Sequence, residues 1–515
     1  MKKGTLFLLL QISLTLLGVY LVGKEMIITK GEWIPILWLM GFGILFWNVI
    51  YLFLMSIFSL FCKPKALPET EITEHPKTAL CYFVRNEDTE LLAKRMDWSL
   101  GNNQIPNLDF WILSDSDREF EEAELKMTEI LKRKYGDRVS YRRREIAHER
   151  KQGNLKDFLD HHPEYEFLYL CDADSLVPPR TVERLLKKAL YPRNTDIALF
   201  QTLIRTAHAK TYYAKFDGIA SESGQRLYFK IHQAIFGSAL SFGHQCLIRR
   251  DAFQRIRLPK GLLSHDNWDT ALLDRLGYRI MFVPEVETFD EAPANYIEAR
   301  QRESRWARGT LQGWPLIFFE NLSLGVRFIL FHSIYCYLAQ PIFLIWFLLG
   351  LFSQSFHFGE LLSFKTDTLW GGEFFINSRV SLILIFSLCV IFFHKLVIVK
   401  NRQDFKNFFY ELFFSTLIFS GNFLYSTLDF LSLPFKKLIW RPMKKDPFDI
   451  LDFSKTAKYL SLGTVFGVLG LLYLWKGTPN IQWASFPLLM SMTLSIPAVY
   501  LSSKSMKGGS SRNDG

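Results

Sequence analysis

The chain has 515 residues, 49% of them hydrophobic and 22% charged, which leaves room for one soluble domain of ordinary size and a set of membrane helices. Its net charge is +10, but the basic residues form no continuous stripe, and this excludes nucleic acid as their main partner. The six cysteines are scattered without a CxxC pair, which argues against a zinc site or a disulfide framework.

Two long apolar runs open the sequence. The first, Gly4–Gly23, is long enough to cross a hydrocarbon core of about 30 Å. Its length, and the lack of an A-x-A-like site after it, argue against a cleaved signal peptide. The second run, Trp33–Cys62, is followed at once by Lys63. We therefore expect residues 1–62 to form a transmembrane hairpin with its basic ends in the cytosol.

Residues 63–312 are charged and mixed, and short apolar segments alternate there with helix-like ones. The strand candidates are "TALCYFV", "DFWILS", "FLYLCDAD", "IALFQTL" and "RIMFVPEV", and the clearest helix candidate is "EFEEAELKMTEILKRKYG". Such alternation predicts an α/β domain with a mostly parallel sheet. In open sheets of this kind, ligands bind beyond the carboxyl ends of the strands.

Membrane character returns in residues 313–515. Four further spans are expected, at Val326–Phe352, Val380–Val399, Tyr459–Trp475 and Ala484–Leu501. The segment Phe405–Phe435 is apolar, but basic residues flank it on both sides. We interpret it as interfacial or re-entrant, because that keeps both flanks in the cytosol. The sequence thus predicts six spans, with both termini and the large domain inside.

The strongest local signal is Asp172-Ala173-Asp174, at the end of the apolar strand candidate "EFLYLC". Two carboxylates together with substrate phosphates are a usual arrangement around Mg²⁺. A metal there would neutralise a diphosphate leaving group. A polar turn after a strand would contain the same residue types, so the motif alone leaves both interpretations open.

A second acidic signal is Asp266 in "LLSHDNWDTALL", just before an apolar helix-like run. A carboxylate there could take the proton from an attacking sugar hydroxyl. From this segment alone a helix N-cap is favoured, because Asp is a good capping residue.

Two basic segments are candidates for diphosphate binding. In "EARQRESRWARG", Arg302 and Arg305 have the bidentate geometry that suits phosphate, and Trp306 could stack on a pyranose. A basic juxtamembrane helix in contact with anionic lipid is favoured from that segment alone. In "SYRRREIAHERKQGN", Lys151 could meet phosphate and Gly153 would permit close approach of a ligand, whereas the preceding arginines are expected in a solvated loop.

The order of these motifs resembles glycosyltransferase family 2, the family of processive synthases of cellulose, hyaluronan and chitin. Over residues 76–320 the segments "FWILSDS", "YRRR", "KQGNLKDF", "CDADSLV", "FGHQCLIRR", "LLSHDNWDTALL" and "RESRW" are similar to the glucans biosynthesis glucosyltransferase H family. That family makes the glucose backbone of osmoregulated periplasmic glucans at the inner membrane. The resemblance implies a GT-A type fold, UDP-glucose as donor, a growing glucan as acceptor, and a divalent cation, Mg²⁺ or Mn²⁺.

The resemblance also implies roles on the donor side. Asn86 and Glu87 would open the nucleotide pocket, and Asp115 would contact uracil. Asp172 and Asp174 would hold the metal and the diphosphate.

On the acceptor side, the resemblance places Gly243 and His244 in a loop beneath the acceptor sugar. Asp266 would be the general base, and Arg305 and Trp306 match the end of a Q-x-x-R-W motif. The chain departs from the wider pattern in having Arg302 at the Gln position.

We therefore expect an inverting glucosyltransferase of the inner membrane, with a cytosolic catalytic domain, that elongates a glucan, with β-1,2 linkage implied by the resemblance alone. Its partners would be the nucleotide sugar, the glucan, the lipid bilayer and a periplasmic glucan-processing protein, and not nucleic acid. The alternatives are another processive synthase, a transferase to a polyprenyl phosphate, or a transporter with a degenerate domain.

Overall fold

The computed structural model describes residues 3–25, 33–62, 64–352, 362–368, 371–376, 379–418, 421–432, 450–476 and 485–506. The chain forms two compact units. The sheet unit contains residues 64–334, and the helical unit contains the described parts of 3–62, 335–432 and 450–505. The division of the chain into functional domains at 1–62, 63–312 and 313–515 remains a prediction.

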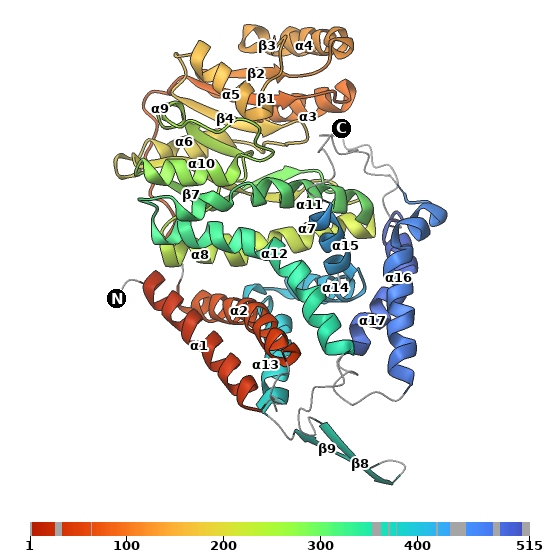
Figure 1. Cartoon of the computed structure of the whole chain (residues 1–515). Coiled ribbons are helices and arrows are strands. Elements are labelled where there is room, and N and C mark those ends of the chain that lie inside the picture. Colours follow the sequence, from red (N-terminus) through yellow and green to blue (C-terminus); the bar gives the residue numbers. More distant parts are fainter. Residues whose placement is uncertain are drawn as a thin grey trace. The chain divides into compact units, whose positions relative to one another are not determined.

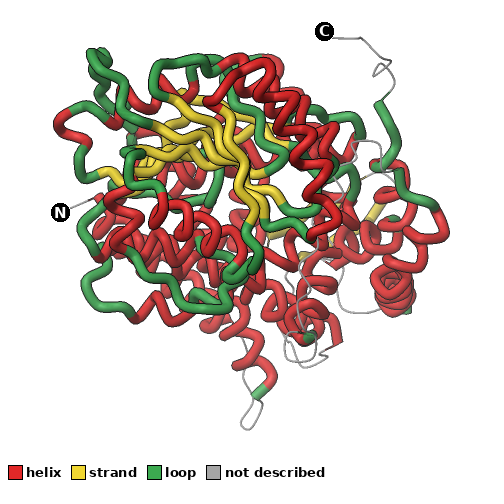
Figure 2. Tube along the Cα trace, turned by 90° about the horizontal axis from the view of Figure 1, so that it is seen from above, coloured by secondary structure: helices red, strands yellow, loops and turns green. Residues whose placement is uncertain are grey.

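The sheet unit is built on a seven-stranded sheet with the order β3-β2-β1-β4-β6-β5-β7. Six of these strands run parallel, and β6 is antiparallel to both of its neighbours. Figure 2 shows the strands as one twisted yellow layer among helices. The strands are β1 (Thr78–Val84), β2 (Leu108–Ser114), β3 (Val139–Arg143), β4 (Phe167–Asp172), β5 (Ile197–Thr206), β6 (Cys246–Arg249) and β7 (Arg279–Asp290).

Both faces of this sheet are buried, which explains why its central strands are continuous apolar runs. All seven residues of β1 are buried, and the six from Ala79 to Val84 alternate between two hydrophobic clusters. One cluster includes α3 (Thr89–Asn102), α4 (Glu121–Tyr135) and α6 (Thr181–Ala189), and the other includes α5 (Arg150–His161), α9 (Arg250–Arg255) and α10 (Asp266–Arg275). The predicted α/β class with a mostly parallel sheet is confirmed.

The rest of the sheet unit is mostly helical. A long helix is divided into α7 (Tyr212–Gly224), a π-helical turn (Gln225–Phe229) and α8 (Lys230–Phe236). After β7 come α11 (Tyr296–Leu311), a 3₁₀ turn (Trp314–Phe318) and the first residues of α12 (Leu324–Phe352). Short 3₁₀ turns also occur at Arg118–Phe120, Gly136–Arg138 and Pro192–Asn194.

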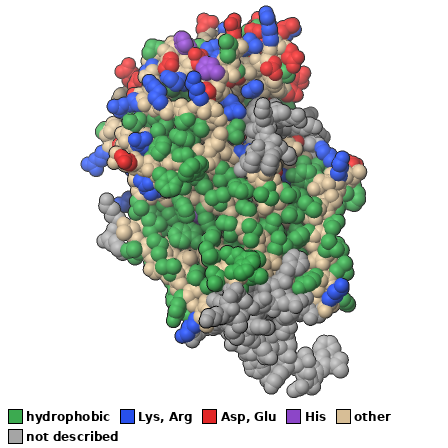
Figure 3. All heavy atoms as spheres, viewed as in Figure 1, with side chains coloured by type: hydrophobic (Ala, Val, Ile, Leu, Met, Phe, Trp, Pro, Cys, Tyr) green, Lys and Arg blue, Asp and Glu red, His purple; other side chains and the backbone are tan. Residues whose placement is uncertain are grey.

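The helical unit contains most of the apolar helices, labelled in Figure 1. Its helices are α1 (Lys3–Glu25), α2 (Ile34–Phe61), the rest of α12, α13 (Arg379–Phe393), α14 (Arg402–Ile418), α15 (Asn422–Leu431), α16 (Phe453–Trp475), α17 (Phe486–Thr493) and α18 (Ser495–Ser502), with a 3₁₀ turn at Leu396–Ile398. Two strands, β8 (Leu362–Thr368) and β9 (Gly371–Ile376), pair antiparallel. Figure 3 shows hydrophobic side chains over α1 and α2, and charged ones over α3 and α4.

Four described helices are long and apolar enough to cross a membrane, at Lys3–Lys24, Ile34–Phe61, Leu324–Leu351 and Phe453–Trp475. They coincide with four of the six expected spans. The expected span Val380–Val399 corresponds to a shorter apolar helix, Leu382–Ile398, and the last one to the two short helices α17 and α18. The total of six spans remains a prediction.

The expected interfacial segment Phe405–Phe435 contains most of α14 and all of α15, and its last three residues lie outside the described residues. Three phenylalanines at spacing i, i+4 and i+8 (Phe405, Phe409 and Phe413) are exposed along one face of α14. An exposed apolar stripe of this kind suits a helix at the membrane surface, so the interfacial placement stays our prediction.

Candidate active site

Polar side chains gather where the parallel strands end. Asn86 follows β1, Asp115 follows β2, Asp172 ends β4 and Asp290 ends β7. Strand register brings the first three close, since Phe83 of β1 pairs with Asp172, and Val84 pairs with Ser114 of β2. The candidate residues of the sheet unit therefore lie at the edge where open α/β sheets bind ligands.

Asp115 is held in a buried ion pair that the sequence interpretation did not foresee. The Nε and Nη2 atoms of Arg144 donate to its two carboxylate oxygens at 2.7 and 2.6 Å, and both side chains are only 6% exposed. Asn154 of α5 donates a third hydrogen bond, 3.0 Å long, to Oδ1. A carboxylate offers about four acceptor positions, so one on Oδ2 remains for a ligand N–H.

The expected solvated loop at Arg142–Arg144 is therefore wrong. Residues 139–143 form strand β3 at the edge of the sheet, and Arg144 directly after it is buried. The arginines there are paired with side chains distant in sequence: Arg142 with Asp157 at 2.7 Å, and Arg144 with Asp115. A local run of positive charge does not reveal partners of this kind.

Asn86 adopts a left-handed backbone (φ 54°), which a network with the β2 loop stabilises. Its backbone N–H donates to Ser116 Oγ at 2.8 Å, and its amide exchanges two hydrogen bonds with Asp117, of 2.7 and 2.8 Å. Glu87 beside it is half-buried. Asp88 caps α3, accepting from two backbone N–H groups, so the segment joins the first strand to its helix.

The two carboxylates of the Asp172-Ala173-Asp174 motif are both partly exposed. Lys151, in the first turn of α5, forms an ion pair with Asp172, whose side chain is 41% exposed. Burial opposes the charge on Lys151, but the adjacent Asp172 outweighs it and the pKa of the lysine is raised. Among the described residues, there is no group of three or more His, Cys, Asp or Glu side chains that could hold a metal ion.

Gly153 is a close-packing position within α5. A Cβ there would collide with the carbonyl oxygen of His148 and would lie 3.0 Å from Arg144 Nη1. The groups that come close to this glycine are thus parts of the same chain, His148 and Arg144, and not a ligand. The absence of a side chain at Gly153 helps α5 to pack against the Asp115–Arg144 pair.

Gly243 and His244 lie close to both Asp266 and Asp172. Gly243 has φ 74°, and a Cβ on it would clash with Oδ1 of Asp266. The next residue, His244, has its Nδ1 atom 3.9 Å from Asp172 Oδ2. Burial opposes the charge on this imidazole, but Asp172 and Asp290 outweigh it and raise its pKa to about 10.

Asp266 is the first helical residue of α10, and the N-cap position is occupied by His265, which makes no capping hydrogen bond with its side chain. The N-cap interpretation favoured by the segment alone is therefore not what the structure has. Asp266 Oδ2 accepts a hydrogen bond from Ser264 Oγ at 2.8 Å, and the side chain is 33% exposed. Burial lowers the pKa of His265, but Asp269 and Asp266 outweigh burial and raise it.

The loop before Asp266 is tied to two distant segments. Glu149 accepts from the backbone N–H of Gly261 at 2.8 Å, and Arg150 donates to the Leu262 carbonyl at 2.5 Å. Gln312 accepts from the backbone N–H of Leu263 at 2.7 Å. Glu149 and Arg150 both have positive φ, 53° and 51°, which is a strained conformation that surrounding contacts must maintain.

Helix α11 brings its basic and aromatic residues to the same region. Gly309 packs against Ser264, where a Cβ would lie 2.5 Å from the serine Cβ. Burial and Arg302 lower the pKa of Arg305, whereas Asp172 and Asp174 act to raise it, so its guanidinium lies within their field.

Arg302 and Trp306 differ in their surroundings on this helix. Arg302 forms an ion pair with Asp217 of α7 at 2.9 Å and lies over the ring of Trp306, 4.7 Å from its centroid. The indole of Trp306 is 47% exposed, and it can still offer a face to a ligand.

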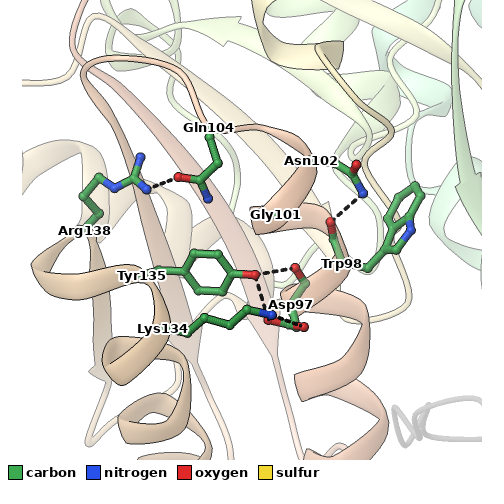
Figure 4. Close-up of a pocket in the computed structure, with 8 residues that line it drawn as sticks. All are labelled: Asp97, Trp98, Gly101, Asn102, Gln104, Lys134, Tyr135 and Arg138. Carbon is green, nitrogen blue, oxygen red and sulfur yellow. Dashed lines mark hydrogen bonds and ion pairs between the residues drawn. The ribbon is translucent and has the colours of Figure 1, made fainter. Parts of the chain in front are cut away.

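A concave region of about 510 Å³ lies between the C-terminal ends of α3 and α4 (Figure 4). Its charged groups are already paired, with Lys134 2.7 Å from Asp97 and Arg138 bonded to Gln104. It adjoins the start of β2, whereas Asp115 and Asp172 lie at the carboxyl ends of their strands.

Residues 167–397 match the model of glycosyl transferase family group 2. The chain is 25% identical over 497 residues to glucans biosynthesis glucosyltransferase H of Pseudomonas fluorescens strain Pf0-1, with 87% of this chain and 56% of the relative covered. The relative of the same name from Pseudomonas aeruginosa strain PAO1 is 24% identical, with 86% and 55% covered. The chain thus spans little more than half the length of these curated relatives.

Among solved structures, the chain is similar to a mannosyltransferase from Pyrobaculum calidifontis in complex with GDP-Man and Mn²⁺. The TM-score is 0.50 at 14% identity, with 79% of this chain and 99% of the other covered. That likeness supports a GT-A-like mixed sheet. The family match and the relatives confirm the predicted resemblance of this chain to the glucans biosynthesis glucosyltransferase H family and to glycosyl transferase family group 2.

Proposed function

We propose that this chain is a membrane-bound inverting glucosyltransferase that transfers glucose from UDP-glucose to the end of a growing glucan. The β-1,2 linkage rests on the similarity to glucans biosynthesis glucosyltransferase H alone. The single observation that carries the proposal is the turn at Gly243 and His244. Gly243 contacts Asp266 and His244 approaches Asp172, which supports placing the proposed base close to the proposed metal motif.

On the donor side, we assign the nucleotide to Asn86, Glu87 and Asp115. Arg144 and Asn154 occupy three of the four acceptor positions of Asp115, and the fourth suits the N3–H of a uracil. The paired carboxylate cannot easily rotate, which favours one base orientation. Gly153 contributes by letting α5 approach this pair closely.

The diphosphate is assigned to Asp172 and Asp174 with a divalent cation, Mg²⁺ or Mn²⁺. Two carboxylates fit such an ion where substrate phosphates complete its oxygen shell. When bound, the ion would offset negative charge on the departing diphosphate. Lys151 and Arg305 add positive charge beside these carboxylates. We also assign Arg302 to the donor side, where its ion pair with Asp217 ties α11 to α7.

On the acceptor side, we assign the proton transfer to Asp266. Its Oδ2 accepts from Ser264, while Oδ1 lies against the Gly243 turn and 3.8 Å from His265 Nδ1. The carboxylate takes the proton of the acceptor hydroxyl as that oxygen attacks the anomeric carbon. Attack opposite the leaving diphosphate inverts the anomeric configuration. The exposed indole of Trp306 stacks on the acceptor sugar.

We place this enzyme in the inner membrane with the sheet unit in the cytosol, where nucleotide sugars are made, and with a periplasmic protein processing the exported glucan. The four long apolar helices and the basic segment at Lys400–Lys406 support that orientation. A single cysteine placed at residues 400–406 should resist an impermeant thiol reagent in intact cells and react after lysis. Labelling in intact cells would contradict the orientation.

The function is tested with the purified full chain in lipid. Separate reactions contain radiolabelled UDP-glucose, UDP-N-acetylglucosamine or GDP-mannose, each with Mg²⁺, Mn²⁺ or EDTA, and any polymer is subjected to linkage analysis. We expect a glucose polymer from UDP-glucose that EDTA abolishes. The Asp266→Asn variant serves as the matched inactive protein. A polymer of another sugar would exclude the proposed donor, and transfer that survives EDTA would exclude the cation.

A further inference from the structure

Asp290, the last residue of β7, is a partly buried carboxylate to which the motifs assign no role. Its side chain is 15% exposed. Oδ2 accepts from Nε2 of His244 at 2.7 Å, and Oδ1 accepts from the side-chain amide of Gln245 at 2.9 Å. One carboxylate therefore binds two consecutive residues of the segment that also contains Gly243.

The second ring nitrogen of His244 fixes the orientation of the imidazole. Nδ1 lies 2.8 Å from the carbonyl oxygen of Phe242. A carbonyl and a carboxylate are both acceptors, so the ring donates from both nitrogens. The ring thus bridges the backbone on one side of Gly243 to the end of β7.

The backbone of this turn requires such support. Gly243 and Gln245 both have positive φ, 74° and 50°, and Gln245 is fully buried. A left-handed conformation at a non-glycine residue persists where the surroundings hold it in place. Besides Asp290, Gln245 binds the Phe289 carbonyl at 2.9 Å and Tyr169 at 2.8 Å, so β7 and β4 both anchor the turn.

The turn forms one wall of the space around Asp266, because there is no room for a Cβ between Gly243 and Asp266 Oδ1. We propose that Asp290 is a positioning residue which, through His244 and Gln245, holds the Phe242–Gln245 turn against Asp266 and so fixes the orientation of that carboxylate. This inference rests on the proposed function, in which Asp266 is the general base.

The test compares wild type and Asp290→Asn in lipid with radiolabelled UDP-glucose. Because misplacement of a reacting group by about 1 Å can cost about 10²-fold, we expect kcat to fall about 10- to 100-fold. The donor KM should stay within about 2-fold, since β1, β4, β6 and β5 separate β7, which ends at Asp290, from β2, which Asp115 follows. The matched control is Asp196→Asn, which removes an ion pair with Arg279 at the opposite end of β7 and should leave kcat unchanged.

A double variant separates positioning from general stability. In the Asp266→Asn background, Asp290→Asn should reduce the residual rate no further, because the group that it positions is already lost. An additional loss of the same size would overturn the inference, as would an unchanged kcat for Asp290→Asn alone. If Asp290→Asn fails to fold, the same assay is made with Asp290→Glu. We expect a smaller loss of kcat and an unchanged donor KM. An unchanged kcat would overturn the inference.

Failure of this inference is distinct from failure of the proposed function. A wild-type chain that transfers none of the tested sugars would refute the function. An active wild type with an equally active and folded Asp290→Asn variant would refute only the role of Asp290.

Discussion

The donor and acceptor sides of the candidate site differ in how firmly their key carboxylates are held. Asp115 on the donor side is 6% exposed and accepts three hydrogen bonds from Arg144 and Asn154. Asp266 on the acceptor side is 33% exposed and accepts one described hydrogen bond, from Ser264. The nearby Trp306 is 47% exposed.

This difference suits the proposed reaction. The donor is the same small molecule in every cycle, so its pocket can be rigid and fully paired. The acceptor is a chain end that must arrive, react and move on, so its side stays open. A rigid donor pocket beside a more open acceptor surface is what repeated transfer to one polymer requires.

The metal motif lies between the two sides, and we expect its loss to have the largest effect. Asp172→Asn or Asp174→Asn should abolish transfer, because each removes a negatively charged carboxylate that would hold the cation at the leaving diphosphate. Transfer assays in lipid, with thermal unfolding to verify folding, check this. Asp160→Asn, at an exposed carboxylate paired with Lys156 at i−4, is the control and should stay active. Near-normal turnover by either motif variant would remove the metal role.

Arg144 tests the rigidity of the donor side. Arg144→Ala leaves the buried carboxylate of Asp115 without its arginine partner. Breaking a buried ion pair in this way costs roughly 3–5 kcal/mol of unfolding free energy. We expect a large loss of thermal stability and, in the folded fraction, weaker UDP binding measured by calorimetry. Arg133→Ala on the exposed face of α4 should change stability by less than about 0.5 kcal/mol. A stable Arg144→Ala protein with normal UDP affinity would show that the pair is dispensable.

Trp306 tests the open acceptor side, and we expect the smallest effect there. Aromatic contacts are worth about 0.5–1.5 kcal/mol, so Trp306→Ala should raise the acceptor KM about 2- to 10-fold and leave donor affinity unchanged. Initial rates against increasing oligosaccharide primer measure this. Trp314→Ala, which removes another exposed indole, is the control. A rise in donor KM instead would place Trp306 on the donor side.

The fold was predictable where burial alone determines the pattern. The strand candidate "TALCYFV" coincides with β1, whose residues are all buried. Strand β3 was missed because "YRR" at its end is charged, and its arginines find partners such as Asp157 only in the folded chain. The division of the sixth expected span into α17 and α18 could not be predicted from composition, because both helices are apolar.

The motifs of the candidate site were predictable from the sequence, but the residues that pair with them were not. Asp115 directly follows one apolar strand and Asp172 ends another, which is a local signal. Arg144 is 29 residues from Asp115, and Asp290 is 46 residues from His244, so neither pairing appears in local spacing. Asp290 also lies in an acidic stretch with Glu287 and Glu291, where composition gives no reason to single it out.

The role of Asp266 is tested most directly by measuring turnover and UDP-glucose affinity for Asp266→Asn in the same lipid preparation as wild type. The substitution keeps the size of the side chain and its ability to accept from Ser264, and removes the base. We predict a folded protein that binds UDP-glucose with unchanged affinity and polymerises about 10²–10⁴-fold more slowly. An Asp266→Asn variant with wild-type turnover would contradict the assignment of Asp266 as the general base.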